Sequence, residues 1–101
     1  MFLFSVALQY ERDPKERAIT YLNRGNILRA RGRFAEALTS YNQSLFLRPG
    51  HYLTHSVRAK AREELGDLEG ALEDTEVSLR LKPGYEEAAK TAERIRQKLQ
   101  R

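Results

Sequence analysis

Cysteine and tryptophan are missing from this chain of 101 residues, which has only three prolines and six glycines. Without cysteine, neither a disulfide framework nor a thiolate metal site can form. The absence fits a reducing compartment, and we expect a cytoplasmic protein. Long apolar runs are missing too. Met1 to Tyr10 is the most apolar stretch, but it is far shorter than the roughly 20 residues of a membrane-spanning helix, and it lacks the basic start and cleavage site of a signal peptide.

Patterns that indicate catalysis are also missing. There is no Gly-x-Ser-x-Gly turn, and the glycines do not form a phosphate-binding loop. Two pairs of adjacent carboxylates, Glu63-Glu64 and Glu86-Glu87, fall in helical stretches, and we expect them to face solvent. The sequence therefore predicts no enzyme, no catalytic residue and no cofactor.

His51 and His55 are four residues apart in HYLTH, which places them on one helix face. Two histidines at this spacing can hold a metal ion. However, no glutamate lies between them and no third ligand is evident nearby. We therefore predict surface or inter-helix histidines and no metal site.

The composition favours a small helical domain. The apolar share is 41% and the charged share 32%, and residues that favour helix are abundant. The net charge of +4 permits acidic peptides or nucleic acid as partners but does not require them, because exposed Arg and Lys can simply be solvated.

An internal repeat organises the chain. The pattern of residues 21–49 returns about 34 residues later, and this period with helix–turn–helix punctuation is typical of stacked helical repeats. The recurring positions pair Gly32 with Gly66, Ala37-Leu38 with Ala71-Leu72, Ser44-Leu45 with Ser78-Leu79, and Pro49-Gly50 with Pro83-Gly84.

The first copy resembles the tetratricopeptide repeat, and the residues that carry the likeness are Gly25, Gly32, Phe34, Ala37, Tyr41 and Pro49. The second copy keeps Ala59, Gly66, Leu68, Ala71 and Pro83 but has Thr75 at the place of Tyr41 and Arg62 at the place of Leu28. The resemblance implies an all-α fold, a short right-handed superhelical α-α solenoid of antiparallel helix pairs with about six helices. It also implies a non-enzymatic scaffold for protein binding.

We expect two full repeats at residues 18–51 and 52–85, with a C-terminal capping helix at 86–101. Residues 1–13 would form an N-terminal capping helix or half repeat. Against a half repeat, the period projected back from Pro49 falls at position 15, whereas the proline is Pro14. If the segment does not pack on its own chain, Phe2, Leu3, Phe4 and Leu8 form an apolar patch that favours a homodimer.

The expected helices cover residues 14–31, 34–47, 51–65, 68–81 and 85–100. Asp13 and Asp67 are the expected N-caps. Gly25 should allow a close approach of the next helix, as Ala59 does in the second copy. The last helix is expected to direct five apolar residues inward: Ala88, Ala89, Ala92, Ile95 and Leu99.

The resemblance also implies a concave groove. Its positions carry over to Ile19, Leu22, Asn26 and Arg29 in the first copy, to Leu53, Ser56, Lys60 and Glu63 in the second, and to Glu87, Lys90 and Arg94 in the last helix. Of these we expect eight to contact a peptide: Leu22, Asn26, Arg29, Leu53, Ser56, Lys60, Lys90 and Arg94. Such a surface suits an extended peptide with acidic groups or a free C-terminus.

One subset of the family binds the C-terminal carboxylates of chaperone tails through a clamp of basic and Asn residues. Only Asn26 matches that clamp. Leu22, Val57, Glu87 and Thr91 stand where the subset has a Lys, an Asn and two basic residues. We therefore predict that this protein does not bind chaperone tails through the full clamp.

Two other functions remain open. One is self-assembly through the N-terminal apolar segment. The other is nucleic acid binding, for which the candidates are Arg24, Arg29, Arg31, Arg33, Arg48 and Arg58. Tyr21, Phe34 and Tyr41 could stack on bases, but we expect them to be used in packing.

Overall fold

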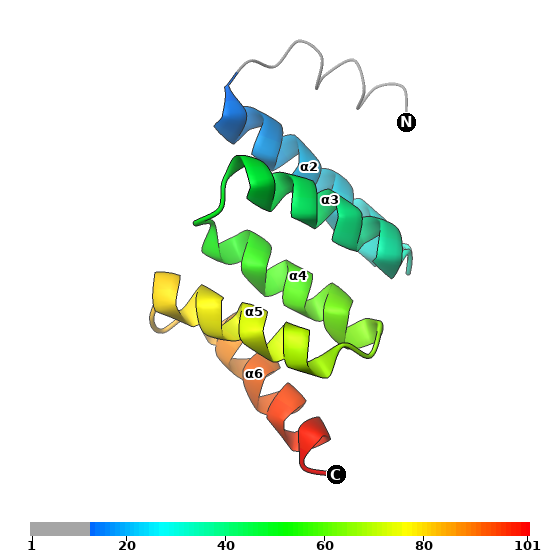
Figure 1. Ribbon diagram of the computed structural model, residues 1–101, viewed down its shortest axis with the longest axis vertical. Helices are drawn as coiled ribbons and strands as arrows, with labels where there is room; N and C mark the ends of the chain where they lie inside the picture. The colour runs from blue at the N-terminus through cyan, green and yellow to red at the C-terminus, as the bar shows by residue number, and fades with distance from the viewer. Residues whose placement is uncertain (1–12) are drawn as a thin grey trace. The chain divides into compact units, whose positions relative to one another are not determined.

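The computed structural model describes residues 13–101, and within this range the chain forms five helices and no strand. They are α2 (Pro14–Ala30), α3 (Phe34–Leu47), α4 (Tyr52–Glu64), α5 (Leu68–Leu81) and α6 (Glu86–Leu99) (Figure 1). The all-α class is confirmed, and each helix end lies within one residue of the one expected. The sixth helix was expected in residues 1–13, which fall outside the described range except for Asp13.

The helices belong to two compact units that divide after Pro49. The first unit contains α2 and α3, and the second contains α4, α5 and α6. Within each unit, short turns join consecutive helices, so neighbours run antiparallel. In the second unit, α5 packs against both α4 and α6.

Two aspartates begin helices as the sequence predicts. A side-chain oxygen of Asp13 accepts a hydrogen bond from the Lys15 amide at 2.9 Å. Asp67 Oδ1 accepts one from the Gly70 amide at 3.0 Å. Each bond satisfies an amide that has no partner inside its helix.

Glycines end the first helix of each pair in the same way. Gly32 has φ of 76° and Gly66 has φ of 86°, a left-handed conformation that glycine adopts without strain. In the first unit, Arg33 N bonds to Leu28 O at 2.9 Å and Gly32 N to Arg29 O at 3.0 Å. The second unit repeats both bonds, 34 residues later, at 2.9 and 3.0 Å. This pattern is a Schellman motif.

A serine ties the two helices of each pair together. Ser44 Oγ donates to the Ala18 carbonyl at 2.7 Å, and Ser78 Oγ donates to the Tyr52 carbonyl at 3.0 Å. Both partners in the second unit lie 34 residues beyond those in the first. The repeat seen in the sequence is therefore a repeat of hydrogen bonds as well.

The two units fill their cores differently. In the first, the fully buried Tyr41 ring lies against Gly25, where a β-carbon would come within 2.5 Å of Tyr41 Cε1. The predicted close approach at Gly25 is thus confirmed. In the second, the core is built from Ala59, Ala71 and Ile95, with Leu68 and Leu72 packed against it.

The inward face of α6 is narrower than expected. Ala88, Ala92 and Ile95 are buried, but Ala89 is exposed and Leu99 keeps 41% of its surface exposed. The prediction was wrong for these two residues, because α6 contacts the rest of its unit along one stripe only. Among the described residues, no helix is both long and apolar enough to cross a membrane.

Candidate peptide-binding faces

In the first unit, one buried hydroxyl orients two polar side chains of α2. Tyr41 Oη donates to Asn26 Oδ1 at 2.7 Å and accepts from Arg29 Nε at 3.1 Å. Because the guanidinium can only donate, the tyrosine proton is directed to Asn26. The amide oxygen of Asn26 is therefore occupied, and its NH2 group is left to donate elsewhere.

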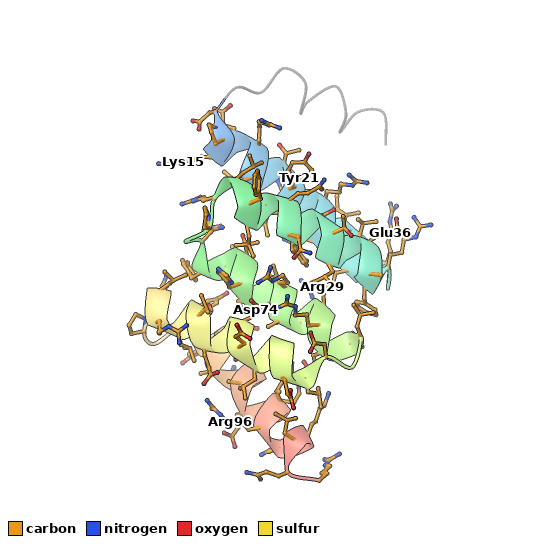
Figure 2. All side chains as sticks on the ribbon, viewed as in Figure 1. Lys15, Tyr21, Arg29, Glu36, Asp74 and Arg96 are labelled. Carbon is orange, nitrogen blue, oxygen red and sulfur yellow. The ribbon has the colours of Figure 1, made fainter. Side chains whose placement is uncertain are left out.

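Tyr41 holds this arrangement without being a surface residue. It has 0% of its surface exposed, and burial raises the pKa of its hydroxyl despite the hydrogen bond and charge of Arg29. The hydroxyl therefore keeps its proton at neutral pH. Asn26 and Arg29 are half-buried, and their outward groups are N–H donors (Arg29 is labelled in Figure 2). Such a pair suits a carbonyl or carboxylate oxygen.

Two of the eight predicted contact residues are not at the surface. Leu22 has 5% and Ser56 has 1% of its surface exposed. Both are buried beneath the face that the family resemblance assigned to them. We therefore remove them from the proposed peptide contacts. Ile19, a neighbouring groove position, is 45% exposed.

In the second unit, Glu63 is buried rather than solvent-facing, which corrects the sequence prediction. Its carboxylate receives two bonds from Arg94, at 2.8 and 2.7 Å, and one from Lys98 at 2.7 Å. The hydrogen bond from Arg94 is the main reason that the pKa of Glu63 is lowered to about 2, and it outweighs the effect of burial. Arg94 is thus oriented by an internal carboxylate.

A second ion pair within the same unit joins α4 and α6. Lys60 Nζ donates to Glu87 Oε2 at 2.9 Å, and this hydrogen bond lowers the pKa of the exposed Glu87. Lys90 is exposed, and Leu53 is half-buried. Around these residues, four cations (Lys60, Lys90, Arg94 and Lys98) stand against three carboxylates (Glu63, Glu64 and Glu87).

The Glu63 pair predicts a pH dependence of stability. The pKa of Glu63 is about 2 in the folded chain against an ordinary 4.5, so its contribution is complete above about pH 4.5 and is lost as pH falls toward 2. One such proton gives a slope of at most about 1.4 kcal/mol per pH unit. In urea unfolding between pH 5 and 2, Glu63→Gln should flatten the curve. Glu64→Gln, at the exposed neighbouring residue, should leave the curve of stability against pH unchanged. Equal curves for the two variants would show that Glu63 is not the source of the pH dependence.

A buried cluster around Asp74 was not predicted. The Asp74 side chain is 3% exposed and accepts bonds from Arg58 at 2.9 and 2.8 Å and from Arg62 at 2.9 Å. His55 Nδ1 lies 3.2 Å from Asp74 Oδ1. Burial alone would raise the pKa of Asp74, but the hydrogen bonds of His55 and Arg58 and the charges of both arginines hold it below its usual value (Asp74 is labelled in Figure 2).

A signal for this cluster was present in the sequence. Arg62 and Asp74 stand where the first copy has Leu28 and Ser40, so two charged replacements of opposite sign occur at equivalent positions. The two histidines also have separate roles, because His51 Nδ1 lies 2.8 Å from Thr54 Oγ1 while His55 faces Asp74. Across residues 13–101, no group of three or more His, Asp or Glu side chains could hold a metal ion.

Comparisons with known proteins agree with the repeat. The tetratricopeptide repeat profile matches residues 18–51. One similar structure is the first tetratricopeptide repeat domain of Spaghetti (RPAP3), solved with the HSP90 peptide SRMEEVD bound. The two sequences are 30% identical, the TM-score is 0.82, and the match covers 83% of this chain and 67% of that one. A search of curated proteins found no match.

Two further structures are similar. The first such domain of human RPAP3 has 31% identity and a TM-score of 0.65, covering 85% of this chain and 62% of its own. The tetratricopeptide repeat domain of Sgt2 from Aspergillus fumigatus has 28% identity and a TM-score of 0.78, and the match covers 81% of this chain and 54% of that one. This chain therefore spans about half to two thirds of the length of these structures. The match to the Spaghetti domain, at 30% identity over two thirds of its length, shows that the chain belongs to the tetratricopeptide repeat family.

Proposed function

We propose that this chain is a non-enzymatic scaffold that binds an extended, acidic peptide segment of a partner protein. The observation that carries the proposal is the Arg29–Tyr41–Asn26 chain of hydrogen bonds. It fixes two donors on α2 before any ligand arrives, which reduces the ordering cost of binding. Residence in the cytoplasm stays a prediction.

The second unit supports the acidic preference. Lys60 and Arg94 are each held by an internal carboxylate, while Lys90 is exposed. With four cations against three carboxylates, this face has a small positive excess that favours an anionic segment. Glu87 already occupies Lys60, so a ligand carboxylate competes with it there. Glu63 likewise occupies Arg94 through two hydrogen bonds. We therefore place Lys90 ahead of both as a peptide contact.

The full chaperone clamp does not fit these side chains. Of the positions that would carry its basic and Asn residues, Leu22, Val57 and Thr91 have 5%, 8% and 1% of their surface exposed. The fourth, Glu87, is an acid paired with Lys60. We expect the peptide SRMEEVD to bind no more tightly than other acidic peptides, and micromolar affinity that depends on its C-terminal carboxylate would contradict this.

The site is tested by the affinity for a panel of acidic peptides, measured by fluorescence anisotropy. Asn26→Ala should weaken the tightest peptide about tenfold, because one good hydrogen bond to a charged group contributes roughly 1.5 kcal/mol. Tyr41→Phe should also weaken it, although Tyr41 has no exposed surface and cannot touch the ligand.

Asn23→Ala is the matched control, because Asn23 is exposed on the same helix. Unchanged affinity in both Asn26→Ala and Tyr41→Phe, or an equal loss in Asn23→Ala, would contradict the site. Binding to nucleic acid instead would overturn the proposed ligand class. One of the arginines suggested for that role, Arg58, is already paired with the buried Asp74.

A further inference from the structure

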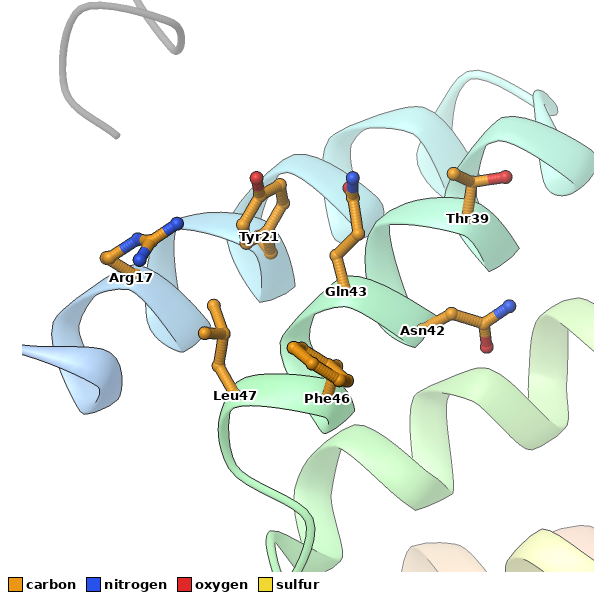
Figure 3. Close-up of a pocket in the computed structure, with 7 residues that line it drawn as sticks. All are labelled: Arg17, Tyr21, Thr39, Asn42, Gln43, Phe46 and Leu47. Atoms are coloured by element: carbon orange, nitrogen blue, oxygen red, sulfur yellow. The ribbon is translucent and has the colours of Figure 1, made fainter. Parts of the chain in front are cut away.

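A hollow of about 450 Å³ opens between α2 and α3 of the first unit, and Asn26 and Arg29 are not among its lining residues (Figure 3). Its apolar lining includes Phe46, which is 85% exposed, the most of any large apolar residue in the described range. A ring so exposed is a candidate contact. The full lining comprises Arg17, Tyr21, Thr39, Asn42, Gln43, Phe46 and Leu47.

This apolar surface is peculiar to the first unit. The second unit has Arg80 at the position of Phe46, 34 residues on, and exposed Glu73 and Glu76 at the positions of Thr39 and Asn42. The repeat therefore does not require an aromatic ring at position 46. Something other than the repeat's own packing accounts for Phe46.

Two unsatisfied donors belong to α2 and line hollows that α3 also lines. Arg17 Nε and Arg24 Nε are buried and have no hydrogen-bond partner among the described residues. Arg17 lines the apolar hollow, and Arg24 lines an adjoining one of about 290 Å³ that shares Thr39 and Gln43 with it. A buried donor without a partner costs about 1–3 kcal/mol, so the occupant should bring oxygen acceptors as well as apolar side chains.

We propose that the occupant is the chain's own N-terminal segment, with its apolar residues Phe2 to Leu8 seated against Phe46 and Tyr21. The segment supplies both kinds of group: Phe2, Leu3, Phe4 and Leu8 are apolar, and its main-chain carbonyls and Glu11 are acceptors for Arg17. Binding in the hollow would also cover the apolar patch of the N-terminal segment that was expected to favour a homodimer.

The attachment point makes this occupant reachable. Asp13 caps α2, and at a rise of 1.5 Å per residue Arg17 and Tyr21 lie only about 6 and about 12 Å along the helix from it. Twelve residues reach about 40 Å when extended, which is well beyond these two distances. A segment tethered so closely acts at an effective concentration of roughly millimolar, so even weak contacts keep it bound.

A nitroxide placed in the segment tests the proposal on the 101-residue chain. Because the protein has no cysteine, Ser5→Cys gives a single attachment site. In a ¹⁵N-labelled chain that carries the nitroxide, the amide signals of Asn42, Gln43 and Phe46 should be lost, and they should return when the nitroxide is reduced. Persistent signals at all three residues would overturn the proposal.

A mixed sample separates the segment's own chain from a second copy. When ¹⁵N-labelled chains without nitroxide are combined with unlabelled chains that carry it, the same signals should persist. Their loss would mean that a neighbouring molecule fills the hollow, and the proposal would be wrong.

Phe46→Arg supplies the variant, because it copies the residue that the second unit has at this place. In the chain that carries the nitroxide, this change should restore the amide signals of Asn42, Gln43 and residue 46. The helix content measured by circular dichroism should not change, because the Phe46 ring is exposed. Leu65→Arg, at a residue 47% exposed in the second unit, should leave the signal loss intact. Signal loss that persists in Phe46→Arg would overturn the proposal. None of these residues belongs to the proposed peptide contacts, so the two proposals stand or fall separately.

Discussion

Asp74→Asn is expected to lower the free energy of unfolding by about 3 kcal/mol. The change keeps the shape of the side chain but removes the charge that Arg58 and Arg62 share at 2.8–2.9 Å. Breaking a buried ion pair from one side costs about 3–5 kcal/mol, because the remaining charge is left without a partner. We take the lower end because Arg58 and Arg62 keep 17% and 24% of their side-chain surface exposed.

A loss of this size is large for a small domain, whose total stability is about 5–15 kcal/mol. It corresponds to a fall in Tm of roughly 12–24 °C. Thermal and urea unfolding of Asp74→Asn and wild type at pH 7 would measure it. Glu73→Gln, at the exposed neighbour on α5, is the matched control and should change the stability by less than about 0.5 kcal/mol. If both variants unfolded like wild type, the Asp74 cluster would not stabilise the second unit.

Gly25→Ala is expected to lower the free energy of unfolding of the first unit by up to about 2 kcal/mol, although alanine favours helix. Helix propensity alone predicts a gain of about 1 kcal/mol. Against this, the new β-carbon would lie 2.5 Å from Tyr41 Cε1 and 2.6 Å from Cδ1, well inside the contact distance of about 3.5 Å. Overpacking a filled core costs roughly 1–3 kcal/mol.

Overpacking should prevail because the ring has no room to retreat. Tyr41 is fully buried, and its hydroxyl is held by Asn26 and Arg29. Moving the ring would also disturb the proposed donors, so Gly25→Ala should lose peptide affinity together with stability. Gly50→Ala is the control, since no atom lies within 4 Å of its added carbon. A Gly25→Ala variant more stable than wild type would show that the approach of α2 and α3 is looser than described.

Local signals in the sequence predicted the helices well. Gly32 and Gly66 require the left-handed conformation at helix ends, and Asp13 and Asp67 cap helix starts through bonds to nearby amides. Each depends on residues within one turn, so a sequence contains the whole determinant. The close contact at Gly25 was also predictable, because the repeat pairs a small residue on one helix with a large one on the next.

Side-chain partners across helices were harder to predict. Glu63 was expected in solvent because it sits in a charged stretch of α4, but two cations from α6, 31 and 35 residues away, enclose it. Asp74 likewise depends on three residues from α4. Leu22 and Ser56 were predicted as peptide contacts from the family's groove positions, yet both side chains are buried inside this chain. Such pairings follow from helix packing that no local window of sequence contains.

The most direct test of the central claim is an amide NMR titration of the 101-residue chain with acidic peptides, each carrying a free or an amidated C-terminus. We predict shifts concentrated at Asn26 and Arg29 in the first unit and at Lys90 and Arg94 in the second, with smaller shifts for the amidated forms. Shifts confined to other surfaces, or no shifts with any peptide at millimolar concentration, would contradict the proposed peptide-binding faces.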